Sequence, residues 1–187
     1  MSSDPIQKLI LKNKNNFRIA AAIGEAWPEI RAQIVEEFFK RLETRMKPRL
    51  KGWTFGSEER FGIDPYPSFH FLKPPWRDQY GLCLQPGDYG RRVVMGIYRE
   101  TNTIGRRAFA PELLEAVSKR FPLAKERRPW WEALIPMQSP SADWRQIHVL
   151  WQLKSDAKVC SDVTDQLLDL AEVSAPILDR IVRKYRK

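Results

Sequence analysis

The sequence predicts an α+β fold with N-terminal helices, an antiparallel β-meander of about 4–5 strands and a long C-terminal helix. Three patterns carry this prediction. Apolar side chains recur at four-residue steps between residues 30 and 46, which is typical of an amphipathic helix. Between residues 53 and 100 apolar and polar side chains alternate, which is typical of strands. Between residues 163 and 185 the helical period returns.

Residues 1–48 are predicted to form a helical layer. Asp4-Pro5 combines a capping side chain with a proline in the first turn, and it starts a helix or helix pair that breaks near Asn15-Asn16 or Gly24. Trp27-Pro28 provides a second start, and the helix that follows ends before Pro48. Its buried stripe consists of Ile30, Ile34, Val35, Phe38, Phe39, Leu42 and Met46.

Residues 53–100 are predicted to form the meander. Alternating segments at 68–72, 80–84 and 92–98 are separated by turns that contain proline and glycine. Strands joined by such short turns pair antiparallel. We expect one face of this sheet to be buried by Phe69, Phe71, Val94 and Ile97 or by their alternates.

The last two regions, 101–143 and 144–187, combine helices with irregular segments. A short helix is predicted at 111–117, followed by a Pro- and Trp-rich loop from 121 to 143 with one helical turn at 131–134. Residues 146–153 alternate and are predicted to form a further strand. The closing helix is expected to start near residue 161 and to kink or break at Pro176.

The composition favours a single domain over residues 1–187 with an anionic partner. A hydrophobic fraction of 43% supports a sizeable core, and a net charge of +9 favours nucleic acid or an acidic protein face. No apolar segment is long enough to span a bilayer or to act as a secretory leader. We therefore expect a cytoplasmic protein without a membrane partner.

The titratable residues do not form a complete catalytic or metal-binding set, so we expect a binding protein without a cofactor. Cys83 and Cys160 lack the spacing of metal ligands, and Cys83 alternates with leucines, which favours a buried structural thiol. His70 and His148 fall on strand faces opposite the apolar stripe, where a surface or hydrogen-bonded histidine is the usual case.

An alternative interpretation is a divergent Mg²⁺-dependent nuclease of the PD-(D/E)XK type, in which carboxylates bind the metal and a lysine positions water. Gln152-Leu153-Lys154 has the required spacing. If residues 144–153 form one strand, Asp143 lies about 30 Å from Gln152, which is too far for a shared metal. The alternative catalytic set is therefore Asp64, Gln152 and Lys154.

Basic doublets beside aromatic residues give the leading hypothesis. Arginines neutralise phosphates or carboxylates, and tryptophans stack on bases or anchor a protein partner. The candidate binding residues are Arg91, Arg92, Arg106, Arg107, Arg127, Arg128, Trp76 and Trp130. A second possibility for the apolar segment around Trp130-Trp131 is that it packs back over its own sheet.

Several short motifs resemble the C-terminal accessory region of PD-(D/E)XK nuclease-superfamily proteins of bacteria and phages. These motifs are Lys51-Gly52-Trp53, Tyr66-Pro67-Ser68-Phe69, Met95-Gly96-Ile97-Tyr98, Trp130-Trp131 and the helix over 167–185. The catalytic residues of that superfamily would precede Met1, so none is carried over. The resemblance implies a non-catalytic module from a nucleic-acid defence, counter-defence or mobile-element context.

Overall fold

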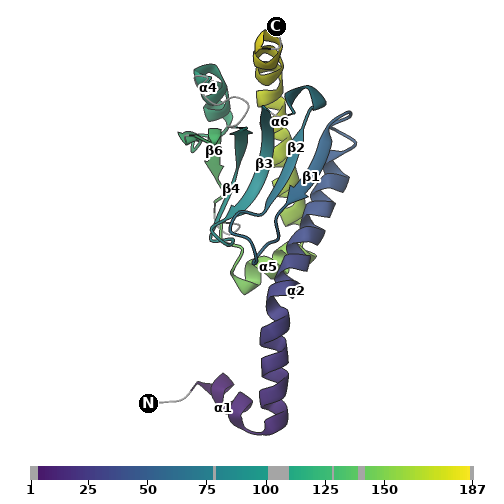
Figure 1. Ribbon diagram of the computed structural model, residues 1–187, viewed down its shortest axis with the longest axis vertical. Coiled ribbons are helices and arrows are strands. Elements are labelled where there is room, and N and C mark those ends of the chain that lie inside the picture. The colour runs from purple at the N-terminus through teal and green to yellow at the C-terminus, as the bar shows by residue number, and fades with distance from the viewer. Residues whose placement is uncertain (1–3, 78, 101–109, 128, 139–141, 186–187) are drawn as a thin grey trace.

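The computed structural model describes residues 4–77, 79–100, 110–127, 129–138 and 142–185. Its described part is a two-layer α+β structure in which helices lie against one face of a six-stranded antiparallel sheet (Figure 1). The predicted fold class is confirmed, including the N-terminal helices and the long C-terminal helix. The sheet has six strands, slightly more than the four or five expected.

The sheet runs in the order β1-β2-β3-β4-β6-β5, and every neighbouring pair is antiparallel. The strands are β1 Thr54–Glu58, β2 Ser68–Leu72, β3 Tyr80–Gly87, β4 Arg92–Arg99, β5 Lys125–Arg127 and β6 Trp131–Pro136. Strands β1 to β4 follow one another as a meander, as the sequence predicts. The hairpin of β5 and β6 then extends the sheet beyond β4, with β6 adjacent to β4.

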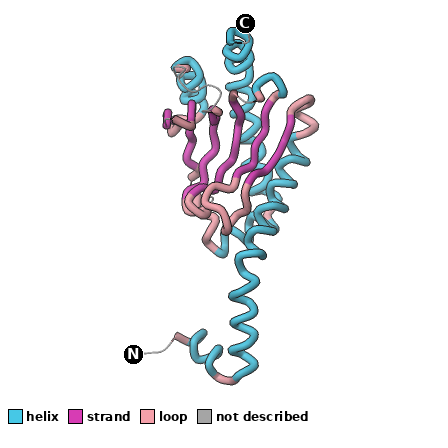
Figure 2. Tube along the Cα trace, in the orientation of Figure 1, coloured by secondary structure: helices cyan, strands magenta, loops and turns pink. Residues whose placement is uncertain are grey.

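The helices are α1 Pro5–Leu11, α2 Lys14–Met46, α4 Pro111–Arg120, α5 Ile147–Ser155 and α6 Ala157–Tyr185, with a short 3₁₀ turn η1 at Pro74–Trp76. Figures 1 and 2 show α6 and the second half of α2 behind the sheet. Helix α5 contacts both α2 and α6, and α4 packs against α6 and the β5–β6 hairpin. The first half of α2 and α1 project away from the sheet (Figure 1).

The core lies between the sheet and the helices. The sheet contributes Phe69, Phe71, Leu82, Leu84, Val93, Met95 and Ile97, and the helices contribute Phe38, Leu42, Met46, Leu167, Leu170 and Leu178, all buried. The expectation for Phe69, Phe71 and Ile97 is therefore confirmed. Val94 is different: it pairs with Gln85 on the opposite face, and its neighbours Val93 and Met95 occupy the buried positions.

The predicted strand over residues 146–153 is wrong, because α5 occupies this segment. Val149, Leu150 and Leu153 are buried, at the spacing of one helix face, whereas Ile147 and Trp151 are 72% and 63% exposed. A short apolar segment fits both periods, so alternation alone could not decide between them.

The predicted loop over residues 121–143 is also wrong, because it contains β5 and β6. Trp131–Pro136 pairs with β4 along its length, and the expected helical turn at 131–134 is part of this strand. The prolines at 129 and 136 lie at or just outside its ends, where a missing N–H interrupts the fewest ladder hydrogen bonds.

Both long helices continue through an internal proline, which the sequence had suggested as a start or a break. Helix α2 starts at Lys14 with Asn13 as its cap and passes through Pro28, so no second helix begins at Trp27. Helix α6 starts at Ala157, where the Asp156 carboxylate accepts the backbone N–H of residue 158 at 2.7 Å, and passes through Pro176. In α6, Leu170 and Leu178 pack into the core on both sides of the proline and offset its cost.

Candidate functional site

In the described part of the chain, no helix covers the second face of the sheet, which we call the open face. It carries the residues that alternate with the core positions, such as His70, Cys83 and Gln85. This face is hollowed into a groove of about 710 Å³. The groove is lined by Glu58, Glu59, Tyr66, Ser68, His70, Cys83, Gln85, Tyr98, Arg99, Glu100, Arg127, Pro129, Trp130 and Trp131.

Glycines in β3 and β4 shape the floor of the groove by letting aromatic rings approach the backbone. A Cβ at Gly81 would lie 2.5 Å from Cζ of Tyr98, so the phenol end of Tyr98 occupies the space above this glycine. A Cβ at Gly96 would lie 3.1 Å from Cε3 of Trp131. Glycine within a strand is unfavourable in itself and marks such close approaches. The floor of the groove therefore consists of aromatic rings that pack against the backbone at these glycines.

The rim of the groove carries exposed aromatic side chains on opposite sides. Trp130 is 56% exposed, although its carbonyl oxygen accepts a 2.9 Å hydrogen bond from the backbone N–H of Arg99. The backbone of Trp130 is thus attached to β4 while its indole ring faces solvent. Tyr66, also 56% exposed, lies next to Gly87 at the other end of β3.

His70 lies in the floor as a largely buried histidine, with 16% of its side chain exposed. Its Nε2 is 2.6 Å from Oγ of Ser68, and its ring meets that of Tyr98 edge-on with 5.0 Å between the ring centres. Burial lowers the pKa of His70 below its ordinary value, against the opposing effect of the Glu58 carboxylate. His70 is therefore a hydrogen-bonded histidine, while His148 is exposed on α5.

The thiol of Cys83 and an ion pair lie beneath the groove. Cys83 is buried, and burial raises its pKa, so the thiol stays protonated and is a poor nucleophile. Arg99 and Glu132, both nearly inaccessible, form an ion pair at 3.3 Å, and Glu132 also accepts the backbone N–H of Ala110 at 3.0 Å. Glu132 is the extra residue where the β4–β6 register shifts. This pair fixes the start of α4 relative to the sheet.

Of the predicted basic residues, Arg92 and Arg127 lie on the open face at opposite ends of the sheet. Arg92 pairs with Gly87, and Arg127 pairs with Trp131, which in turn pairs with Tyr98. Six residues of β4 separate the two ends, a distance of about 20 Å. Both arginines are exposed, and neither forms an ion pair within the described part of the chain.

The other predicted arginines differ in position or lie outside the structure described. Arg91 is in the β3–β4 turn, 58% exposed and 4.0 Å from Asp88. Arg106, Arg107 and Arg128 lie outside the described residues. The described arginines therefore mark two ends of one face and not a single patch.

Trp76 does not belong to the exposed set. It is fully buried in η1, and its Nε1 donates a 2.8 Å hydrogen bond to Oδ1 of Asp179 in α6. The other carboxylate oxygen of Asp179 accepts from Nζ of Lys73 at 2.5 Å. Trp76 therefore attaches the sheet to α6 and is unavailable for stacking on a ligand.

The residues of the alternative nuclease site do not share a common surface element. The Asp64 carboxylate accepts the backbone N–H of Arg60 at 2.7 Å and closes its own loop. Gln152 and Lys154 lie on a helix, where residues two apart point in directions about 200° apart instead of to the same side. Among the described residues, no three His, Cys, Asp or Glu side chains are placed to hold a metal ion.

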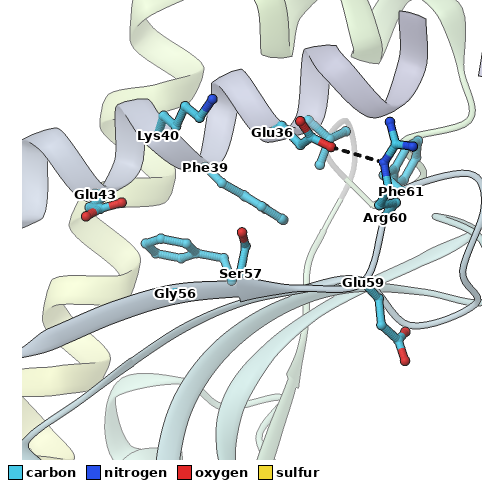
Figure 3. Close-up of a pocket in the computed structure, with 11 residues that line it drawn as sticks. Glu36, Phe39, Lys40, Glu43, Gly56, Ser57, Glu59, Arg60 and Phe61 are labelled. Atoms are coloured by element: carbon cyan, nitrogen blue, oxygen red, sulfur yellow. Dashed lines mark ion pairs between the residues drawn. The ribbon is translucent and has the colours of Figure 1, made fainter. Parts of the chain in front are cut away.

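A second cavity, of about 300 Å³, lies on the helix side between α2 and β1 (Figure 3). Arg60 at its end is already paired with Glu29 at 2.6 Å and with Glu36 at 3.5 Å, and Glu43 also lines it. Figure 3 shows Glu59 pointing away from α2, towards the side of the open face. Because Arg60 is already paired and the remaining cation, Lys40, shares the cavity with Glu36 and Glu43, this cavity is poorly suited to an anionic partner.

None of the helices in the described ranges is long and apolar enough to cross a membrane. Comparisons with protein-family models, with curated proteins and with solved structures find no match to this chain. The resemblance to an accessory region of PD-(D/E)XK proteins therefore stays a prediction.

Proposed function

We propose that this protein binds single-stranded nucleic acid along the open face of its sheet. The observation that carries the proposal is the exposed indole of Trp130 next to Arg127, at the rim of a groove with an aromatic floor. Bases stack on aromatic rings whatever their sequence, and arginines neutralise the adjacent phosphates. A duplex, whose bases are already stacked, could not use these rings.

The charges of the groove favour one placement of the phosphates and bases of the bound strand. Glu58 and Glu59 line one wall, while Arg127 lies at the other, on the edge strand β5. Phosphates repelled by the glutamates would lie along the Arg127 side, which leaves the bases directed towards Trp130 and Tyr98. Arg92, about 20 Å away, would receive a phosphate several nucleotides further along. The net charge of +9 attracts the polyanion over longer distances.

The proposal is tested by fluorescence anisotropy with labelled single-stranded DNA, single-stranded RNA and duplex DNA at salt concentrations between about 50 and 300 mM. We expect Trp130→Ala to weaken single-strand binding by about fivefold to 150-fold, since one stacked base contributes about 1–3 kcal/mol. Arg127→Ala should lower the slope of log affinity against log salt by about 0.7. Comparing the affinities for single-stranded DNA and single-stranded RNA shows which of the two the protein prefers.

Matched control variants lie outside the groove. Trp151→Ala removes a tryptophan that is 63% exposed on α5, and Arg45→Ala removes an exposed arginine on α2. Both should bind like the wild-type protein. Equal losses for Trp130→Ala and Trp151→Ala would contradict the groove as the binding site. An absence of binding to every oligonucleotide at the lowest salt would favour an acidic protein face as the partner instead.

A further inference from the structure

The N-terminal arm, which we define as α1 and residues 14–30 of α2, contacts the rest of the protein at its base, where Trp27 packs against the core and Glu29 pairs with Arg60 at 2.6 Å. Helix α1 has no buried residue, and the first buried residue of α2 is Ala32. Figures 1 and 2 show the arm extending along the long axis, away from the sheet and the other helices. The α2 part of the arm alone is about 25 Å long.

The arm is apolar to a degree that is unusual for a solvated helix. Among the large hydrophobic side chains that are exposed in the described part of the chain, half belong to the arm: Ile6, Leu9, Leu11, Phe17, Ile19, Ile23 and Ile30, each between 41% and 72% exposed. Contiguous exposed apolar surface of this kind marks an interaction site in a folded protein. Helix α1 contacts α2 but leaves these side chains accessible.

One stripe of the arm has the spacing of a helix–helix interface. Ile19, Ile23, Ala26 and Ile30 follow one another at steps of four, three and four residues, and all four are exposed. This is the spacing of the two apolar positions in a heptad, which pack against the same positions of a facing helix. We call these four residues the seam. A second helix with the same apolar stripe therefore complements the seam.

The charges of the arm favour a second copy in antiparallel orientation. The tip carries the cations Lys8, Lys12, Lys14 and Arg18, whereas the base carries Glu25 together with Glu29, whose carboxylate is also paired with Arg60. Antiparallel packing brings the basic tip of one arm to the acidic base of the other, and parallel packing would place like charges together. Antiparallel arms also leave the two sheets at opposite ends of the pair, where they do not collide.

The surface area is consistent with a dimer. The chain exposes 11513 Å², whereas a compact protein of its mass exposes about 9,300 Å². A standard interface removes only about 800 Å² from each partner. We infer that the arm is a dimerisation element, whose seam packs antiparallel against the seam of a second copy. This inference is independent of the proposed nucleic-acid binding, because the arm and the groove share no residue.

The test is the molar mass of the full chain by sedimentation or light scattering at concentrations from about 1 to 100 μM. We expect twice the chain mass of 21.9 kDa for the wild-type protein and the monomer mass for the variant Ile19→Glu with Ile23→Glu. Both positions are exposed, so circular dichroism should show an intact fold. Ile147→Glu changes an isoleucine that is 72% exposed on α5 and should leave the dimer intact.

Cysteine crosslinking tests the orientation separately. When two seams pack antiparallel, Ile19 of one copy lies opposite Ile30 of the other. The double variant Ile19→Cys with Ile30→Cys should therefore form intermolecular disulfides under mild oxidation, whereas Ile19→Cys alone should not. A wild-type protein that is monomeric at every concentration would overturn the inference. A dimer that survives both glutamate substitutions would contradict the seam as the interface. Disulfides formed by Ile19→Cys alone would contradict the antiparallel orientation.

Discussion

Three glycine-to-alanine substitutions on the open face test how closely neighbouring groups pack against the backbone of the groove floor. At Gly96, a new Cβ would overlap the carbonyl oxygen of Ala133 and lie 3.1 Å from the carbonyl carbon. This neighbour is backbone in the β4–β6 ladder, so it cannot rotate away. We expect Gly96→Ala to lower the free energy of unfolding by about 3 kcal/mol, at the upper end for overpacking.

At Gly81 the same methyl group meets only the ring of Tyr98, 2.5 Å from Cζ. The ring can swing out into the groove, so Gly81→Ala should cost about 1 kcal/mol, partly offset by the lower entropy of the unfolded chain. At Gly56, also on the open face, nothing lies within 4 Å of the added Cβ. Gly56→Ala is therefore the matched control and should stabilise the protein by about 0.5 kcal/mol.

Urea unfolding at equilibrium is the assay. With a slope of about 2 kcal/mol per M, the Gly96→Ala midpoint should fall by about 1.5 M and the Gly81→Ala midpoint by about 0.5 M. Because displaced Tyr98 would obstruct the groove floor, Gly81→Ala should also weaken oligonucleotide binding. Equal midpoints for Gly96→Ala and Gly56→Ala would refute the close packing of β4 against β6 on which the groove depends.

Two further predictions concern buried polar groups. Burial lowers the pKa of His70, so the folded protein binds a proton there less readily than the unfolded chain, in which a histidine is protonated below about pH 6.5. Stability should therefore fall as the pH decreases from 7.5 to 5.5, and urea midpoints should show a smaller fall for His70→Gln. An identical fall in the two proteins would contradict the burial of the ring. Asp179→Ala leaves the buried N–H of Trp76 without its acceptor and should lower the free energy of unfolding by about 1–3 kcal/mol. Asp179→Asn keeps an acceptor oxygen and should lower it less. Similar thermal midpoints for the two variants would argue against this hydrogen bond.

The parts of the fold that sequence reasoning identified have one period over a long enough segment. Phe38, Leu42 and Met46 continue a helical stripe, and Phe69 and Phe71 alternate within a strand bounded by turns, so each pattern has one interpretation. The strand prediction for this segment, residues 146–153, was wrong because an apolar segment of this length fits a strand and a helix equally well. Its helical state depends on packing against α2 and α6, which no local pattern contains.

The site was only partly predictable. Trp130 and Arg127 were identified from their types, and both line the groove. Trp76 was included for the same reason, although it is buried, since composition alone does not separate core tryptophans from exposed ones. Tyr66 and Tyr98 were not assigned to the site, but Gly81 and Gly96 within predicted strands were a usable signal of aromatic rings close to the backbone.

Photo-crosslinking reports directly where a bound strand lies on the protein. A single-stranded oligonucleotide that carries 5-iodouracil is irradiated with the wild-type protein at about 50 mM salt, and the modified peptides are identified by mass spectrometry. If the strand binds along the open face, we expect crosslinks at Trp130 and Tyr98, reduced by excess unlabelled single strand and little affected by duplex. Crosslinks confined to α2 and α6, or an absence of crosslinks, would contradict it.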